Sequence, residues 1–281
     1  MSSADRFWTG TAVVTGAGSG LGASMVERFA AEGMSIVALD IDGERVEQTA
    51  QGVRDKGGRA IAMRVDVADR SALDAAAAAA RAEFGGCNVL CANVGVQQFG
   101  AIDALTDNDW RWVLDVNVLG VVNTVSAFLP LLRESPGNRR VVVTSSSSVL
   151  VPGVRLAAYI ASKFAVMGYG ETLRMELAPE DIGVSVFFPA GMSSRHLESS
   201  KLARPEALGP SILRREDIDV MLASRKVDTA DHVVTPERAT RNLLAELRNN
   251  ERFIVSHGAY RDELVERCDA LVAAFDRAQA N

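Results

Sequence analysis

Short apolar runs alternate along this chain with longer segments that have the pattern of helices. This alternation is typical of a parallel sheet with helices on both faces, because each pair of parallel strands needs a crossover between them. We expect one doubly wound α/β domain over residues 1–281, with about seven strands. Its 48% hydrophobic content is enough to bury one large core.

The expected strands are residues 12–14, 35–39, 61–65, 88–92, 140–144, 184–188 and 253–256. The expected helices are residues 21–31, 69–84, 107–132, about 157–177, 236–249 and a terminal helix. The alanine run within 69–84 indicates helix propensity rather than low complexity. Residues 193–230 are rich in charge and contain Pro205, Gly209 and Pro210, so they predict an irregular segment.

Bulk properties exclude several classes of partner. The net charge is −6 and no Lys/Arg-rich run occurs, which argues against nucleic acid and anionic membranes. The N-terminus lacks the apolar stretch of a signal peptide, and no apolar segment approaches the ~20 residues of a membrane span. The few cysteines and histidines are scattered without metal-ligand spacing. We therefore expect a cytoplasmic protein without a metal.

The first expected strand runs into Thr-Gly-Ala-Gly-Ser-Gly-Leu-Gly at positions 15–22, and then into a helix. Glycines allow positive φ and let backbone N–H groups approach a pyrophosphate at the helix N-terminus. A strand, turn and helix of this kind indicate a Rossmann-type dinucleotide site. A glycine-rich loop without a ligand is the alternative.

Asp40 closes the second expected strand about twenty residues after the glycine turn. A carboxylate at this point accepts hydrogen bonds from an adenosine ribose and repels a 2′-phosphate. No Arg or Lys lies in the turn or directly beside Asp40 in the sequence. The pattern thus predicts NAD rather than NADP. The alternative is that Asp40 only caps the helix that follows Asp42.

Tyr159 and Lys163 are four residues apart, so both side chains lie on one face of a helix. A nearby ammonium lowers the pKa of a phenol from its usual value near ~10. The pair is therefore a candidate general acid/base. The alternative is an ordinary surface pair. Four serines, 145–148, precede it.

Taken in order, these motifs resemble those of the short-chain dehydrogenase/reductase family over almost the whole chain. The resemblance rests on the glycine turn, the pair Asp66-Val67, the sequence Ala-Asn-Val-Gly at 92–95, Asn117, and a serine, Ser146, thirteen residues before Tyr159-x-x-x-Lys163. The resemblance implies an oxidoreductase that transfers a hydride between NAD and a secondary alcohol or ketone. A catalytically silent dinucleotide sensor and a Rossmann-type methyltransferase are the alternatives.

The resemblance also implies roles for individual residues. Tyr159 is the general acid/base, Lys163 lowers its pKa and holds the nicotinamide ribose, and Ser146 donates a hydrogen bond to the substrate oxygen. Asn117 positions a water that links Lys163 to solvent, or else makes a helix–helix hydrogen bond in the core. The implied cofactor-binding residues are Gly16, Ser19, Gly20, Leu21, Gly22, Asp40, Asp66, Val67, Asn93, Gly95, Tyr159, Lys163, Pro189, Met192 and Ser194.

Two departures concern the nicotinamide end of the site. The Pro-Gly of the family is Pro189-Ala190 here, with Gly191 displaced by one, and Ser194 replaces the usual Thr. The serine run also leaves Ser145 and Ser147 as rivals to Ser146, although side chains alternate along a strand and the spacing favours Ser146.

The substrate and the oligomeric state are less constrained. Residues 193–230 correspond to the family's variable substrate segment, expected here as a lid over an apolar or aromatic substrate; the alternative is an amphipathic helix packed on its own core. Its apolar residues, with Met192 before it, are Leu197, Leu202, Leu208, Ile212, Leu213, Met221 and Leu222. We expect a homodimer or homotetramer that pairs through residues 107–132 and 157–177. These two segments contain more apolar residues than one sheet-facing stripe can hold, including Trp112, Val116, Phe164, Met167 and Leu173.

Overall fold

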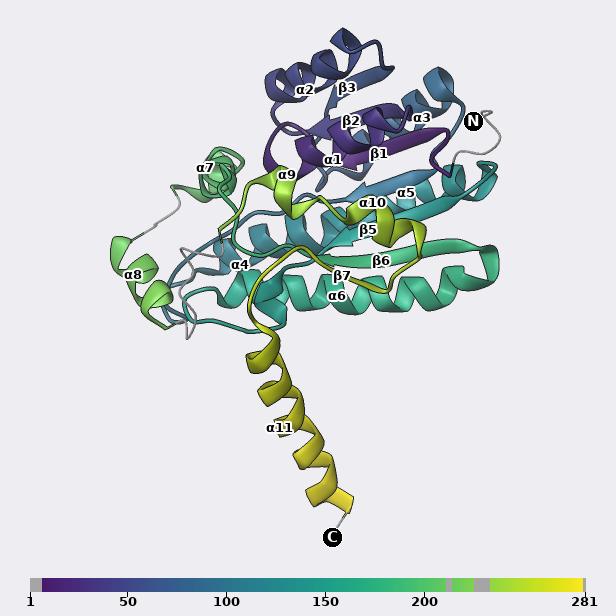
Figure 1. Ribbon diagram of the computed structural model, residues 1–281. Coiled ribbons are helices and arrows are strands. Elements are labelled where there is room, and N and C mark those ends of the chain that lie inside the picture. The colour runs from purple at the N-terminus through teal and green to yellow at the C-terminus, as the bar shows by residue number, and fades with distance from the viewer. Residues whose placement is uncertain (1–6, 211–213, 225–232, 280–281) are drawn as a thin grey trace.

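A seven-stranded sheet forms the centre of the computed structural model, which describes residues 7–210, 214–224 and 233–279. All neighbouring strands are parallel, in the order β3-β2-β1-β4-β5-β6-β7 (Figure 1). The strands are β1 (Thr11–Thr15), β2 (Ser35–Asp40), β3 (Ala60–Arg64), β4 (Val89–Ala92), β5 (Arg139–Thr144), β6 (Ile182–Phe188) and β7 (Phe253–Val255). The predicted doubly wound sheet is confirmed.

Helices cover both faces of this sheet and create two cores. One face carries α1 (Gly20–Ala31), α2 (Gly43–Asp55), α9 (Pro236–Ala239) and α10 (Leu243–Arg248). The other carries α3 (Arg70–Phe84), α5 (Gly120–Glu134) and α6 (Ala157–Leu177), with α4 (Asp107–Leu114) leading into α5. Strand residues alternate between the two: Val13 packs in the second core, whereas Ala12 and Val14 pack in the first. This is the arrangement expected for strands buried on both faces.

Side-chain caps fix where several helices begin. The Asp42 carboxylate accepts from the Arg45 N–H at 3.1 Å at the start of α2. Thr106 and Asp109 form a reciprocal capping box at the start of α4. These contacts satisfy backbone N–H groups that have no partner within a helix.

The predicted helix 107–132 is not continuous. A π-turn, η2 (Asp115–Leu119), separates α4 from α5 and carries Asn117. Such turns are frequent at functional sites. The predicted helix 236–249 is also divided, into α9 and α10. The break follows Thr240, whose buried hydroxyl hydrogen-bonds Ser24 and Arg28 of α1 instead of facing solvent.

Residues 193–230 are more regular than expected. Their described part contains α7 (His196–Leu202), the short 3₁₀ turn η5 (Glu206–Leu208) and α8 (Arg215–Ala223). Residues 211–213 and 225–230, with Ile212 and Leu213, lie outside the described residues. Long-range contacts explain the helices, since Met221 of α8 is buried beside Tyr159, and these contacts leave no local signal in the sequence.

The long helices bear on two of the expectations drawn from the sequence. Within the described residues, Asp107–Glu134 is long and apolar enough to cross a membrane by length and composition, although half of it packs inside the structure. Length and composition alone are weak evidence for a membrane span, because the core helix of a globular protein passes the same test. Trp112 and Leu173, expected at a subunit interface, are buried in the chain's own cores. The exposed apolar residues of these helices are instead Leu114, Leu119 and Met175.

The last helix, α11 (Arg261–Gln279), projects away from the sheet and buries none of its residues (Figure 1). It contacts the body through Arg267, which donates to the Leu150 carbonyl at 3.2 Å and lies over the Phe164 ring. Val265, Leu271, Val272 and Phe275 on this helix are exposed.

The three cysteines differ in exposure: Cys87 and Cys91 are buried near the sheet, while Cys268 is exposed on α11.

Candidate active site

A cavity of about 1420 Å³ opens at the carboxyl ends of the strands. It lies where the strand order changes direction between β1 and β4, which is where open α/β sheets bind ligands. Every residue predicted to bind the cofactor lines this cavity, and so does Ser146. Of the predicted site residues, only Asn117 does not. These residues therefore form one contiguous surface.

The glycine turn requires glycine for steric reasons at two positions. Gly16 has φ +68°, a conformation that side chains disfavour. A Cβ on Gly22 would lie 2.0 Å from the Gly16 carbonyl oxygen, so no side chain fits where α1 crosses the turn. Asn93 holds the turn from β4, since its backbone N–H donates to Thr15 Oγ1 at 3.0 Å and its amide donates to the Thr15 carbonyl at 3.2 Å. Asn93 is thus a clamp on the turn.

Asp40 faces the turn and does not cap the following helix. Its carboxylate accepts from Gly18 N–H at 2.8 Å and from Asp42 N–H at 3.0 Å. Asp42 caps α2, so the capping alternative for Asp40 is wrong. Burial raises the pKa of Asp40, and these backbone hydrogen bonds oppose that rise. Asp40 thus presents its carboxylate to the cavity beside the glycine turn.

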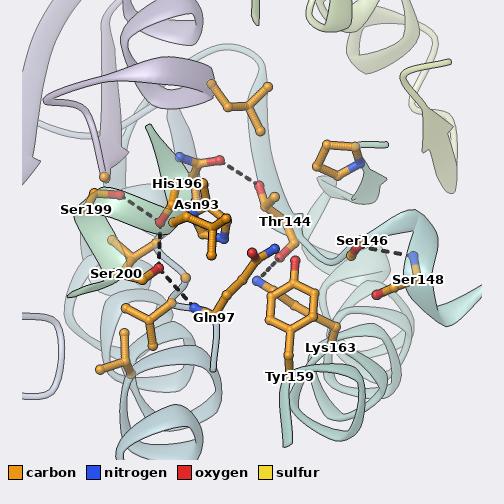
Figure 2. Close-up of a pocket in the computed structure, with 18 of the residues that line it drawn as sticks. Asn93, Gln97, Thr144, Ser146, Ser148, Tyr159, Lys163, His196, Ser199 and Ser200 are labelled. Atoms are coloured by element: carbon orange, nitrogen blue, oxygen red, sulfur yellow. Dashed lines mark hydrogen bonds between the residues drawn. The ribbon is translucent and has the colours of Figure 1, made fainter. Parts of the chain in front are cut away.

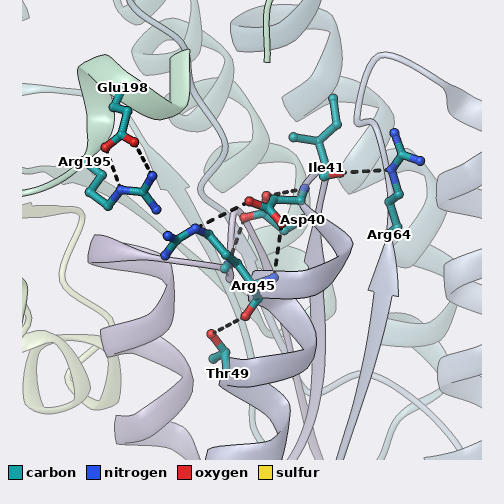
Figure 3. A network of polar contacts seen from close by, with 9 residues as sticks. Asp40, Ile41, Arg45, Thr49, Arg64, Arg195 and Glu198 are labelled. Carbon is teal, nitrogen blue, oxygen red and sulfur yellow. Dashed lines mark hydrogen bonds and ion pairs between the residues drawn. The ribbon is translucent and has the colours of Figure 1, made fainter. Parts of the chain in front are cut away.

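Three arginines surround this end of the cavity, which sequence proximity to Asp40 did not reveal (Figure 3). Arg45 pairs with Asp42 at 3.5 Å, Arg64 donates to the Ile41 carbonyl at 3.1 Å, and Arg195 pairs with Glu198. Each arginine comes from a different element, and each has a partner within the protein. No Arg or Lys lies beside Asp40 in the sequence, but the fold brings these three arginines to the same end of the cavity.

The Tyr159 hydroxyl lies between two polar side chains. Figure 2 shows Ser146 and Gln97 on opposite sides of the hydroxyl, and both side chains act to lower the pKa of Tyr159. Ser146 Oγ also accepts from the Ser148 N–H at 3.1 Å. Ser145 faces elsewhere, since its hydroxyl donates to the Lys163 carbonyl at 2.8 Å. Just past the end of β5, Ser145 and Ser146 therefore point in different directions, and Ser146 faces the tyrosine.

The Lys163 ammonium lies over the face of the Tyr159 ring. The ammonium donates to the Thr144 carbonyl at 3.0 Å and lies 5.8 Å from the Tyr159 ring centroid. Burial lowers the pKa of Lys163 to about 8. Burial also raises the pKa of Tyr159, with smaller opposing effects of Ser146 and Gln97. The predicted lowering of the Tyr159 pKa by Lys163 is therefore not seen, because desolvation outweighs other effects in this arrangement.

Asn117 is fully buried and its side chain is committed to structure. Its amide accepts from Val96 N–H at 2.7 Å and donates to the Val96 carbonyl at 3.0 Å. It also donates to Ser162 Oγ on α6 at 2.9 Å. This is the helix–helix hydrogen bond weighed as the alternative. The residue fixes the loop after β4 against the helix that carries Tyr159.

The segment after β6 is held by the C-terminal part of the chain. His257 contacts the Gly191 carbonyl through Nε2 at 2.9 Å, and Ser256 Oγ accepts from Ala190 N–H at 3.1 Å. Met192 forms a β-bridge with Val234. Ser194 lies against the start of α1, where a Cβ on Gly20 would be 3.5 Å from its own Cβ. With Gly191 displaced by one position, the segment after β6 still lies beside the glycine turn.

Several lining residues had no recognised signal in the sequence. Gln97 follows the Asn-Val-Gly segment by two residues, so proximity to that motif could have indicated it. His196 packs edge-on to Tyr159 with ring centroids 6.4 Å apart, and burial lowers its pKa to about 4. It is therefore neutral at pH 7 and a poor proton carrier there. An apolar wall of Phe99, Leu156, Ile160 and Met221 completes the tyrosine's surroundings.

Comparisons with known proteins agree with this geometry. Residues 10–204 match the family model described as short chain dehydrogenase. A 3beta-hydroxysteroid dehydrogenase 1 from Eggerthella lenta is 36% identical over 204 residues, covering 70% of this chain and 76% of that protein. A C alpha-dehydrogenase from Sphingobium sp. is 30% identical over 263 residues, covering 93% and 85%.

A solved structure is also similar over nearly the whole chain. It is a short chain dehydrogenase/reductase from Burkholderia phymatum in complex with NAD, with 28% identity, a TM-score of 0.85 and 96% coverage of both chains. Its sheet and the present one share the same fold. The chain belongs to the short-chain dehydrogenase/reductase family of oxidoreductases.

Proposed function

We propose that this protein is an NAD-dependent alcohol dehydrogenase or ketoreductase with Tyr159 as its general acid/base. The observation that carries the proposal is the position of the Tyr159 hydroxyl, which faces Ser146 in the same cavity that contains the glycine turn and Asp40 (Figure 2). A proton-transferring group and a dinucleotide-shaped surface thus share one space.

The lining residues fit a nicotinamide dinucleotide. The N-terminal turn of α1 offers backbone N–H groups to a pyrophosphate, and Asp40 offers a carboxylate to the adenosine ribose. Lys163 supports the ribose at the other end. Because Arg45, Arg64 and Arg195 already have partners in the protein, the Asp40 carboxylate favours NAD over a 2′-phosphorylated dinucleotide.

The bound dinucleotide supplies the group that accepts or donates the hydride. In alcohol oxidation the Tyr159 phenolate removes the hydroxyl proton, and in ketone reduction the phenol returns it. Ser146 donates a hydrogen bond to the substrate oxygen as charge develops there. Lys163 provides a buried positive charge beneath the ring, and Asn117 holds the loop and helix that keep these groups in register. A water-linking role for Asn117 belongs to the same proposal.

An apolar substrate fits the surroundings of Tyr159. Phe99, Leu156 and Met221 form a wall beside the hydroxyl, and a relative of this chain is named for a hydroxysteroid, a bulky apolar alcohol. We also propose that α7 and α8 act as a lid. Hydrogen exchange in these two helices should slow when NAD and a substrate analogue bind together; equal protection with and without ligands means a rigid wall.

Two further proposals concern assembly and the rival function. The exposed apolar residues of α4, η2 and α6 support a homodimer or homotetramer, which light scattering can test. The catalytically silent sensor is not favoured, since the chain keeps Ser146, Tyr159 and Lys163 together. The direct test is the absorbance of reduced nicotinamide during incubation with NAD and a panel of apolar secondary alcohols. No reduction with any of them, under conditions where NAD binds, contradicts the proposal.

A further inference from the structure

The main chain at Gln97 is fixed from two directions. Asn117 binds both the N–H and the carbonyl of Val96, the residue before it, at 2.7 and 3.0 Å. The N–H of Gln97 itself donates to Ser200 Oγ at 3.0 Å (Figure 2). A residue held this firmly on both sides can direct its side chain with little loss of entropy on substrate binding.

The Gln97 side chain extends into the cavity towards the Tyr159 hydroxyl, opposite Ser146 (Figure 2). A primary amide has N–H donors, and a donor aimed at a phenol oxygen stabilises the phenolate more than the phenol. Burial acts in the opposite direction on Tyr159. Because the Lys163 ammonium donates to the Thr144 carbonyl and lies 5.8 Å from the Tyr159 ring centroid, donors at the phenol oxygen itself matter more here.

Helix α7 carries Ser200, one of the two residues that hold the main chain at Gln97. The Ser200 hydroxyl that receives the Gln97 N–H donates in turn to the His196 carbonyl at 2.6 Å. Ser199, the neighbouring residue, donates to the same carbonyl at 3.1 Å. Only Ser200 of these two serines hydrogen-bonds Gln97. The chain thus contains a matched pair of hydroxyls that differ in one contact.

We propose that Gln97 is a positioning residue for Tyr159, held by α7 through Ser200, an inference that rests on the proposed function. Its amide donates to the Tyr159 oxygen from the side opposite Ser146 and stabilises the phenolate that removes the alcohol proton. Displacement of α7 weakens this support and slows oxidation.

The test reads the ionisation of Tyr159 without turnover. The chain has three tyrosines, so Tyr169→Phe with Tyr260→Phe leaves Tyr159 as the only phenol, and its ultraviolet absorbance follows its titration. In this background Gln97→Met should raise the titration midpoint by about 0.5 to 1 pH unit, and Gln97→Glu should raise it further through like charge. Circular dichroism checks that each variant is folded. Unchanged midpoints in both variants overturn the proposal.

The serine pair tests the link to α7. Ser200→Ala should raise the same midpoint by a smaller amount, because the main-chain support is lost while the amide remains. Ser199→Ala should leave it unchanged. Equal shifts in the two alanine variants overturn the link, since both lose a bond to the same carbonyl and only one loses a bond to Gln97.

Kinetics separates this inference from the proposed function. In the otherwise unchanged enzyme, Gln97→Met should lower kcat for alcohol oxidation about tenfold at neutral pH and less at high pH, with the KM for NAD within about twofold. Absence of turnover in the wild-type enzyme contradicts the proposed function, while the titration still tests Gln97. Normal turnover with a pH profile unaffected by Gln97→Met contradicts the inference alone.

Discussion

The two ends of the cavity are built in different ways. At the dinucleotide end, the carboxylate of Asp40 at the end of β2 accepts from the backbone N–H groups of Gly18 and Asp42, so these contacts stay close to one strand–helix–strand unit. At the substrate end, segments distant in sequence meet through side chains: Arg204 pairs with Asp109 at 2.7 Å, and Arg155 with Asp217 at 3.4 Å. The first end is specified by local pattern, and the second by tertiary packing.

This difference determines how each end should respond to substitution. The strand–helix–strand backbone at the dinucleotide end does not depend on the Asp40 side chain, so substitutions there should alter selectivity while the fold persists. Side chains at the substrate end form the structure itself, so their loss should change shape and preference together. The four predictions below test that contrast, in order of decreasing expected effect.

Replacing Tyr159 by Phe should lower kcat about 10³-fold and leave NAD binding within a few-fold, because the hydroxyl transfers the proton but does not hold adenosine. Steady-state kinetics and a fluorescence titration with NADH measure the two effects. Tyr169→Phe, on the same helix, is the matched control and should retain turnover. A variant that keeps more than about a tenth of the wild-type kcat removes Tyr159 from the mechanism.

Replacing Asp40 by Ser should raise the ratio of kcat/KM for NADP to that for NAD about 100-fold. The change removes a charge that repels a 2′-phosphate and leaves Arg45, Arg64 and Arg195 around the space. Asp42→Asn is the control, since it keeps an acceptor for the α2 cap and should change the ratio much less. An unchanged ratio in Asp40→Ser places cofactor selection elsewhere.

Replacing Lys163 by Met should stabilise the fold by about 2 kcal/mol at pH 7, because burial disfavours the ammonium. The lowered folded-state pKa means that the unfolded chain binds more protons between pH 8 and 10.5. The contribution of Lys163 to the stability of the wild-type protein therefore rises with pH across that window. The Lys163→Met variant lacks this rise. Urea denaturation at pH 7 and 9.5 measures this. A destabilised Lys163→Met protein at both values contradicts the argument.

Replacing Met221 by Ala should change the preference between a bulky and a small secondary alcohol about tenfold, because it removes part of the wall beside Tyr159. The dissociation constant for NAD should stay within about twofold. Met175→Ala, at an exposed site on α6, is the control. A change in NAD affinity without a change in substrate ranking assigns α8 to the cofactor end.

The residues that the sequence predicted for the dinucleotide site lie together in the structure for a physical reason. Gly22 must be glycine because of the Gly16 carbonyl, and Asp40 must follow a strand to face Gly18, so composition and order record the geometry. Asn117 shows the limit of this reasoning: its position was found, but its contacts with Val96 and Ser162 depend on a π-turn that has no local signal. The arginines around Asp40 and the helices α7 and α8 depend on pairing across the fold, which residue spacing does not encode.

The contrast between buried and exposed thiols gives this chain a single natural attachment point. Burial raises the pKa of Cys87 and Cys91, so neither forms a reactive thiolate readily, whereas Cys268 is exposed on the projecting helix. A maleimide dye should therefore label one position without mutagenesis. That position adjoins Arg267, whose guanidinium contacts Leu150 at the cavity rim, so the dye's anisotropy would report how firmly the projecting helix is docked as ligands enter.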